Sequence, residues 1–157
     1  MKSLQGNLRR NSAVSELHPS RPFSGGIILS YKCNLSCKHC MYACSPKWKG
    51  DWIPEEDALK IIFQLAEEAK GRYHDPEKVG VNYGFHFTGG EPFLKFDLLL
   101  ELVEASSSLG LPSTFVETNC FWCRSDEATR SRMEALRNAG LKGILVSVNP
   151  FIVESIP

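Results

Sequence analysis

The sequence lacks a long apolar run, a secretory leader and an excess of charge of either sign. No stretch of about 18 apolar residues occurs, which excludes a transmembrane helix of ordinary length. Residues 1–25 contain no apolar stretch of the roughly 7 to 15 residues that a signal peptide requires. Lys plus Arg and Asp plus Glu each number 18, so the formal net charge is zero. We therefore expect a protein of the reducing cytosol, with no general attraction to nucleic acid or to membranes.

Cysteine, by contrast, is present in two groups. Four of the six cysteines fall between positions 33 and 44, and the other two form a Cys-x-x-Cys pair. The first group is Cys33, Cys37, Cys40 and Cys44, and the second is Cys120 and Cys123. In a reducing compartment such groups indicate metal or redox chemistry rather than structural disulfides.

The hydrophobic pattern predicts strands that alternate with helices within a chain of about one domain. Strands are expected over residues 27–29, 81–88, 114–118 and 144–149, and helices over 54–70, 96–109 and 126–139. The last three strands begin roughly 30 residues apart, which is the length of a β-α-β crossover unit. We therefore predict a parallel sheet with right-handed crossovers. Residues 1–25 are expected to be a flexible arm, and 26–157 a single α/β domain.

Two of the predicted strands carry polar residues on one face only. Small and polar residues alternate with aromatic ones along 81–88, and Ser147 and Asn149 lie on the same side of 144–149. An open sheet covered by helices on both faces is apolar on both faces. The pattern instead favours a curved sheet around a ligand cavity, with helices on the outside only.

The loop that follows the first strand contains the spacing Cys33-x-x-x-Cys37-x-x-Cys40. Soft thiolates this close together are ligands for a single iron–sulfur or zinc centre. Three of them leave one iron of a four-iron cluster free for another ligand. Cys44 as a fourth ligand would instead complete a structural zinc site or a ferredoxin-like cluster.

The same three cysteines resemble the signature of the radical S-adenosylmethionine (radical SAM) superfamily, in which they hold a [4Fe-4S] cluster and S-adenosylmethionine (SAM) chelates the fourth iron. The segment Gly89-Gly90-Glu91-Pro92, directly after the second strand, is similar to the GGEP motif of that family. Thr118 and Asn119 resemble its Thr-Asn-Gly segment. The residues that the resemblance assigns to SAM binding are His39, Gly89, Gly90, Glu91, Pro92, Thr118, Asn119, Ser147 and Asn149.

The resemblance covers residues 26–149 and implies a fold, an activity and partners. The fold would be a partial (β/α) barrel with about four of the family's six β/α units, which places the motifs at the carboxyl ends of successive strands. The activity would be reductive cleavage of SAM to a 5′-deoxyadenosyl radical that abstracts hydrogen from an unknown substrate. An electron donor such as a flavodoxin or ferredoxin is implied as a partner. No catalytic residue is assigned.

The chain ends soon after its fourth predicted strand. We therefore expect either a truncated reading frame or one half of a split enzyme whose missing strands come from a second chain. A non-catalytic iron–sulfur or zinc protein, acting in electron transfer, is the alternative.

For four further residues the sequence allows either a functional or a structural role. His86 and Glu117 could face the cavity, but buried histidines are more often satisfied by the surrounding protein. Cys120 and Cys123 could hold an auxiliary centre, or could be small buried apolar residues. Cys120 also replaces the glycine that the family usually has after Thr-Asn, which leaves the backbone conformation there an open question.

Overall fold

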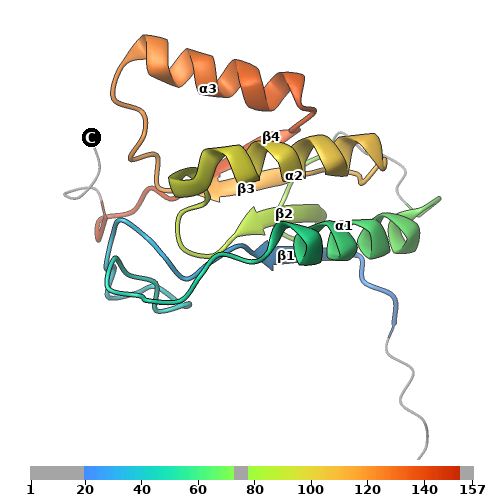
Figure 1. Ribbon diagram of the computed structural model, residues 1–157, viewed down its shortest axis with the longest axis horizontal. Coiled ribbons are helices and arrows are strands. Elements are labelled where there is room, and N and C mark those ends of the chain that lie inside the picture. The colour runs from blue at the N-terminus through green and yellow to red at the C-terminus, as the bar shows by residue number, and fades with distance from the viewer. Residues whose placement is uncertain (1–19, 73–77, 153–157) are drawn as a thin grey trace, which may run out of the picture.

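The computed structural model describes residues 20–72 and 78–152. In this part of the chain strands and helices alternate as predicted (Figure 1). The elements are β1 (Ser24–Ile28), α1 (Glu55–Ala69), β2 (Gly84–Thr88), the 3-10 helix η1 (Pro92–Lys95), α2 (Phe96–Ser108), β3 (Phe115–Thr118), α3 (Asp126–Asn138) and β4 (Gly143–Val146). Residues 1–19 of the expected N-terminal arm lie outside the described residues.

The four strands form one parallel sheet in the order β1-β2-β3-β4. Its register pairs Gly26 with His86, and pairs Phe115 with both His86 and Gly143. Consecutive strands are therefore neighbours, as right-handed crossovers produce in a barrel wall. Within the described residues the sheet does not close on itself, because β1 and β4 are both edges. The predicted α/β fold with a partial barrel is confirmed.

The three helices lie on one face of the sheet (Figure 1). Between them and the sheet lies the hydrophobic core, which includes the fully buried Ile62, Leu99, Leu102, Phe85, Phe87 and Val116. Because side chains alternate along a strand, His86 and Thr88 of β2 project to the face that bears no helix. The expectation of helices on the outside only agrees with this arrangement.

The helix ends follow the sequence signals. Ser125 caps α3, and its side chain accepts a hydrogen bond of 3.2 Å from the backbone N–H of Ala128. After α2 and α3 the chain turns at Gly110 and Gly140, which have φ of 70° and 100°. Pro54 differs slightly from expectation, because it stands directly before α1 rather than in its first turn.

The strand boundaries differ more from the predicted ranges. β1 starts at Ser24, three residues earlier than expected. β2 starts only at Gly84, because residues 80–83 form a turn in which Tyr83 N–H donates to the Gly80 carbonyl over 2.8 Å. β4 ends at Val146, where Ser147 N–H still donates to the Thr118 carbonyl over 2.9 Å and Val148 N–H folds back to the Val146 carbonyl over 3.1 Å. Hydrophobic alternation alone did not reveal these turns.

None of the helices in residues 20–72 and 78–152 has the length and apolar character needed to span a bilayer.

Candidate functional site

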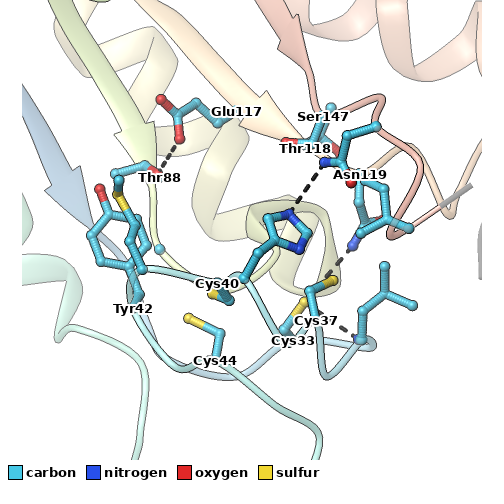
Figure 2. A pocket seen from close by; sticks show the side chains of 17 residues that line it. Cys33, Cys37, Cys40, Tyr42, Cys44, Thr88, Glu117, Thr118, Asn119 and Ser147 are labelled. Carbon is cyan, nitrogen blue, oxygen red and sulfur yellow. Dashed lines mark hydrogen bonds between the residues drawn. The ribbon is translucent and has the colours of Figure 1, made fainter.

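A cavity of about 250 Å³ lies where the loops that follow the four strands meet (Figure 2). In Figure 1 these loops lie at the left, beyond the arrowheads of the strands. The cavity is lined by Cys33, Leu35, Cys37, His39, Cys40, Met41, Tyr42, Cys44, Thr88, Gly89, Gly90, Glu117, Thr118, Asn119, Ser147, Asn149 and Ile152. All three cysteines predicted to bind metal are in this lining. Of the residues assigned to cofactor binding, only Glu91 and Pro92 are outside it.

The cysteine loop is closed at its base and folded by internal turns. Cys33 N–H donates to the Ser45 carbonyl over 3.4 Å, and Ser45 N–H donates to the Tyr31 carbonyl over 3.3 Å. Within the loop, Cys40 N–H donates to the Cys37 carbonyl over 3.0 Å. This turn keeps the two cysteines close together, and in Figure 2 the thiols of the loop gather on one side of the cavity.

Burial raises the pKa of the thiols of Cys33 and Cys37, and neighbouring cysteines raise both values further. At Cys33 one hydrogen bond opposes the rise in pKa: Leu35 N–H lies 3.4 Å from the sulfur. The side-chain nitrogen of Asn119 also lies 3.7 Å from this sulfur. Such thiols keep their protons until a cation stabilises the thiolates. The donor set therefore suits a soft metal centre.

A single metal ion and an iron–sulfur cluster require different arrangements of thiolate ligands. In residues 20–72 and 78–152 no three His, Cys, Asp or Glu side chains converge on a point where one ion could be held. An iron–sulfur cluster takes each thiolate at a different iron, so its ligands surround a larger volume. Cys33, Cys37 and Cys40 all line the same cavity.

Cys44 is a fourth thiol in the same cavity. The residue is only 5% exposed, and it lines the cavity together with Cys40. Burial, followed by the charge of Cys40, raises the pKa of Cys44 to about 12. The structure thus keeps Cys44 within reach of the loop that the other three cysteines form.

The Gly89–Gly90 turn packs directly against the chain that enters the cysteine loop. A Cβ added to Gly90 would lie 1.8 Å from the Lys32 carbonyl oxygen, and one added to Gly89, at φ 117°, would lie 2.5 Å from that of Ser30. Gly90 N–H donates to the Ser30 carbonyl over 2.7 Å, and Glu91 N–H donates to the Lys32 carbonyl over 3.0 Å. Only glycines allow this contact, which fixes the turn relative to the loop.

Glu91 lies outside the cavity and connects the loops around it. The residue is 1% exposed, and its carboxylate accepts hydrogen bonds from Phe93 N–H at 3.1 Å, the Thr118 hydroxyl at 2.8 Å and Asn119 N–H at 2.8 Å. Burial raises the pKa of Glu91, and these three donors oppose the rise. The carboxylate therefore ties η1 to the end of β3.

Asn119 continues this connection to the cysteine loop. Its side-chain amide donates to the side-chain oxygen of Asn34 over 2.9 Å, and its own oxygen accepts from Phe121 N–H over 3.0 Å. The next residue, Cys120, has φ of 59°. The backbone question raised by the sequence is thereby answered, because Cys120 adopts the left-handed conformation that glycine takes most easily.

The loop after β4 reaches the cysteine loop across the cavity. The side-chain nitrogen of Asn149 lies 3.2 Å from Nε2 of His39, within hydrogen-bond distance. The His39 ring also lies 5.1 Å from the ring of Phe151, centroid to centroid. These contacts join positions that are far apart in the sequence.

Glu117 is a lining residue to which the sequence assigned no role, whereas His86 is not among the residues that line the cavity. Its carboxylate accepts a hydrogen bond of 2.6 Å from the Thr88 hydroxyl (Figure 2) and lies 3.3 Å from Nε2 of His86. His86 stacks on Phe115, with ring centroids 4.6 Å apart. Burial lowers the pKa of His86, and Glu117 opposes that shift. The available signal was the position of Glu117 directly before Thr118 and Asn119.

Known proteins match the part of the chain that contains the strands, helices and cavity described above. The family model described as "Radical SAM superfamily" matches residues 27–151. PqqA peptide cyclase of Rhizobium meliloti is 28% identical over 127 residues, which are 81% of this chain and 29% of the relative. GTP 3′,8-cyclase of Aquifex aeolicus is 32% identical over 123 residues, 78% of this chain and 34% of the relative. The chain thus spans about a third of the length of these curated relatives.

Proposed function

Since the chain belongs to the radical SAM superfamily, we propose that it forms the cluster- and cofactor-binding part of an enzyme that reductively cleaves SAM. The resulting 5′-deoxyadenosyl radical would abstract hydrogen from a substrate that the residues do not identify. The observation that carries this proposal is the common cavity. The three signature cysteines line it together with the glycine turn and polar residues from the ends of β3 and β4.

In this proposal Cys33, Cys37 and Cys40 bind a [4Fe-4S] cluster. The cluster would supply the single electron for cleavage of SAM. The chain's own contribution is to hold the three thiols on one side of the cavity and to direct N–H donors at sulfur. The Asn119 amide and Leu35 N–H already do so at Cys33. Such donors stabilise thiolate charge and tune the potential of a bound cluster.

The assigned cofactor residues would divide into two groups. Gly89, Gly90, Thr118, Asn119, Ser147, Asn149 and His39 line the cavity and could contact SAM directly. Glu91 and Pro92 would act from outside, because Glu91 directs its carboxylate at Thr118 and Asn119. The His39 ring, close to that of Phe151, is suited to stack on an aromatic base.

The exposed edge of the sheet suggests where further chain would join. Among the described strands β4 pairs with β3 alone, and Leu145, Val146 and Val148 are 42%, 45% and 68% exposed. A parallel strand added there would cover these side chains and pair the free edge. Such strands would come from a longer form of this protein or from a second chain. A one-electron donor such as a flavodoxin or ferredoxin, acting in the cytosol, is the further partner that the chemistry needs.

Anaerobic reconstitution with iron and sulfide tests the proposal. We expect a [4Fe-4S] cluster whose electron paramagnetic resonance spectrum changes when SAM is added, followed by release of 5′-deoxyadenosine after reduction. Replacement of Cys33, Cys37 or Cys40 by Ser should abolish cluster formation. A bound zinc ion, or a cluster that does not respond to SAM, would contradict the proposal.

Cys44→Ser separates the two cluster interpretations. If three cysteines hold the cluster, this variant should keep the cluster and the response to SAM. If Cys44 is the fourth ligand, as its place in the same cavity lining would allow, the cluster should be lost or should become responsive to SAM only in the variant. Ser36→Ala, in the same loop but without a thiol, is the matched control for effects on folding.

A further inference from the structure

Cys120 and Cys123 lie in a tight turn between β3 and α3. Cys123 N–H donates to the Cys120 carbonyl over 3.0 Å, which closes a four-residue turn. The ends of a β-turn have Cα atoms less than about 7 Å apart. A disulfide spans Cα atoms about 4.4 to 6.8 Å apart, so the backbone already has the right spacing for one.

The two cysteines are near neighbours in this turn and are accessible. After burial, the charge of Cys123 is the largest influence that raises the pKa of the Cys120 thiol. Both residues are partly exposed, and neither lines the cavity that contains the other four cysteines. A small oxidant can therefore reach this pair without entering the candidate cofactor site.

The backbone around Cys120 is held in a conformation that a side chain opposes. At φ of 59° a glycine would be less strained than a cysteine. The conformation is fixed by Cys120 N–H, which donates to the Thr118 hydroxyl over 3.1 Å, and by Phe121 N–H, which donates to the Asn119 side chain. A strained backbone conformation persists only where the surrounding structure holds it in place. Such conformations are concentrated at functional sites. A thiol at this position suggests use of the sulfur.

We propose that Cys120 and Cys123 form a redox-active dithiol that small disulfides oxidise to an intramolecular disulfide. The thiolate of Cys123 attacks the small disulfide and releases one thiolate as a mixed disulfide forms. The Cys120 thiol then loses its proton, attacks Sγ of Cys123 and releases the second thiolate. Two cysteine thiols are oxidised and one small disulfide is reduced to two thiols.

Burial and the charge of Cys123 support this order of attack. They raise the pKa of Cys120 to about 12, which makes it the poorer initial nucleophile. Once Cys123 carries a mixed disulfide, its negative charge is gone, and Cys120 can lose its proton more easily.

Oxidation would act next to the cavity. The pair follows Thr118 and Asn119 directly, and Asn119 contacts the sulfur of Cys33 and the side chain of Asn34. A disulfide would lock the turn that positions Asn119. The proposal itself does not require that a cluster or SAM binds.

Peptide mapping of the full chain tests the proposal. The chain is equilibrated with mixtures of glutathione and glutathione disulfide, and its free thiols are blocked with N-ethylmaleimide before trypsin digestion. Cleavage after Lys and Arg places Cys120 and Cys123 together in peptide 96–124, whereas peptides 33–38 and 39–47 contain the other four. We expect peptide 96–124 two hydrogen atoms lighter and unlabelled, at an oxidising ratio about tenfold or more below the ratio that the urea-unfolded chain needs.

Single variants distinguish the internal disulfide from other reactions. In Cys120→Ser the remaining thiol should stop at a mixed disulfide with glutathione, because its resolving partner is absent. Recovery of doubly labelled wild-type peptide under oxidising conditions would overturn the proposal, as would cross-linking to peptide 33–38 or 39–47. Peptide 96–124 could also escape labelling by N-ethylmaleimide while it keeps both thiol hydrogens, and regain labelling after a chelator is added. That result would overturn the proposal and would indicate a bound metal instead.

Discussion

Replacing Gly90 by Ala should break the contact between the glycine turn and the cysteine loop. The new Cβ would lie 1.8 Å from the oxygen and 2.4 Å from the carbon of the Lys32 carbonyl, both of which are backbone atoms. A rotamer change cannot relieve such a clash, so the two segments must move apart. That movement disrupts the hydrogen bonds from Gly90 N–H to Ser30 and from Glu91 N–H to Lys32.

The expected loss of folding free energy combines these two effects. Overpacking in a dense region costs about 1–3 kcal/mol. Each weakened backbone hydrogen bond adds about 1 kcal/mol at most. Because the strain and the broken bonds relieve each other in part, we expect about 2–4 kcal/mol in total. That is a large share of the stability of an ordinary domain, about 5–15 kcal/mol.

Two other glycines provide controls for this measurement. Gly80 and Gly110 have no atom within 4 Å of an added Cβ, and Gly110 alone of the two has a positive φ, of 70°. Gly80→Ala should change stability by no more than about 0.5 kcal/mol. Gly110→Ala should cost about 1 kcal/mol, because alanine is strained in the left-handed region.

Urea unfolding followed by far-ultraviolet circular dichroism measures all three variants. The reasoning is refuted if Gly90→Ala unfolds at the same urea concentration as Gly80→Ala. Iron–sulfur reconstitution of folded Gly90→Ala provides a second measurement. We expect it to retain less cluster than Gly110→Ala, since Gly90, unlike Gly110, contacts the chain that enters the cysteine loop.

Three further predictions concern other parts of the structure. Cys120→Gly should be about 1 kcal/mol more stable than Cys120→Ala in urea unfolding, because only glycine relieves the strain at φ of 59°; equal stabilities would contradict this. Burial lowers the pKa of His86 and Glu117 opposes that shift, so Glu117→Gln should lower the pKa further in an NMR titration. The pKa of His86 is lower in the folded than in the unfolded protein, so folding stability is lost as pH falls from about 6.5 toward the folded pKa. The Glu117→Gln variant should lose more stability over this range. An unchanged or higher His86 pKa in the variant would show that the two groups do not interact. Ser125→Ala should cost about 1 kcal/mol through loss of the α3 cap, whereas Ser131→Ala, at an exposed position inside the same helix, should cost nothing measurable.

The candidate site depends on long-range contacts that share a few residues. Glu91 connects the glycine turn to Thr118 and Asn119, and Asn119 connects β3 to Asn34 in the cysteine loop. A substitution in one loop should therefore alter the others. This coupling explains why Glu91 can be important without lining the cavity.

The sequence by itself determined the order of strands and helices and, to within one residue, the ends of α2 and α3. Those features depend on periodicity, capping and glycine, all of which act between residues close in the chain. It also determined the grouping of Cys33, Cys37 and Cys40. Residues three or four positions apart stay within one loop, and this closeness does not depend on contacts with distant segments.

Only the tertiary structure decided which polar residues face the cavity. Glu117 and Thr88 belong to strands separated by a helix, and the register of β2 against β3 brings them together at 2.6 Å. The same register buries Glu91 beside Thr118, a position that its motif does not reveal. The left-handed Cys120 likewise depends on bonds to neighbouring side chains rather than on its own preference. Register and burial arise from packing between distant segments, and for that reason no local pattern contains them.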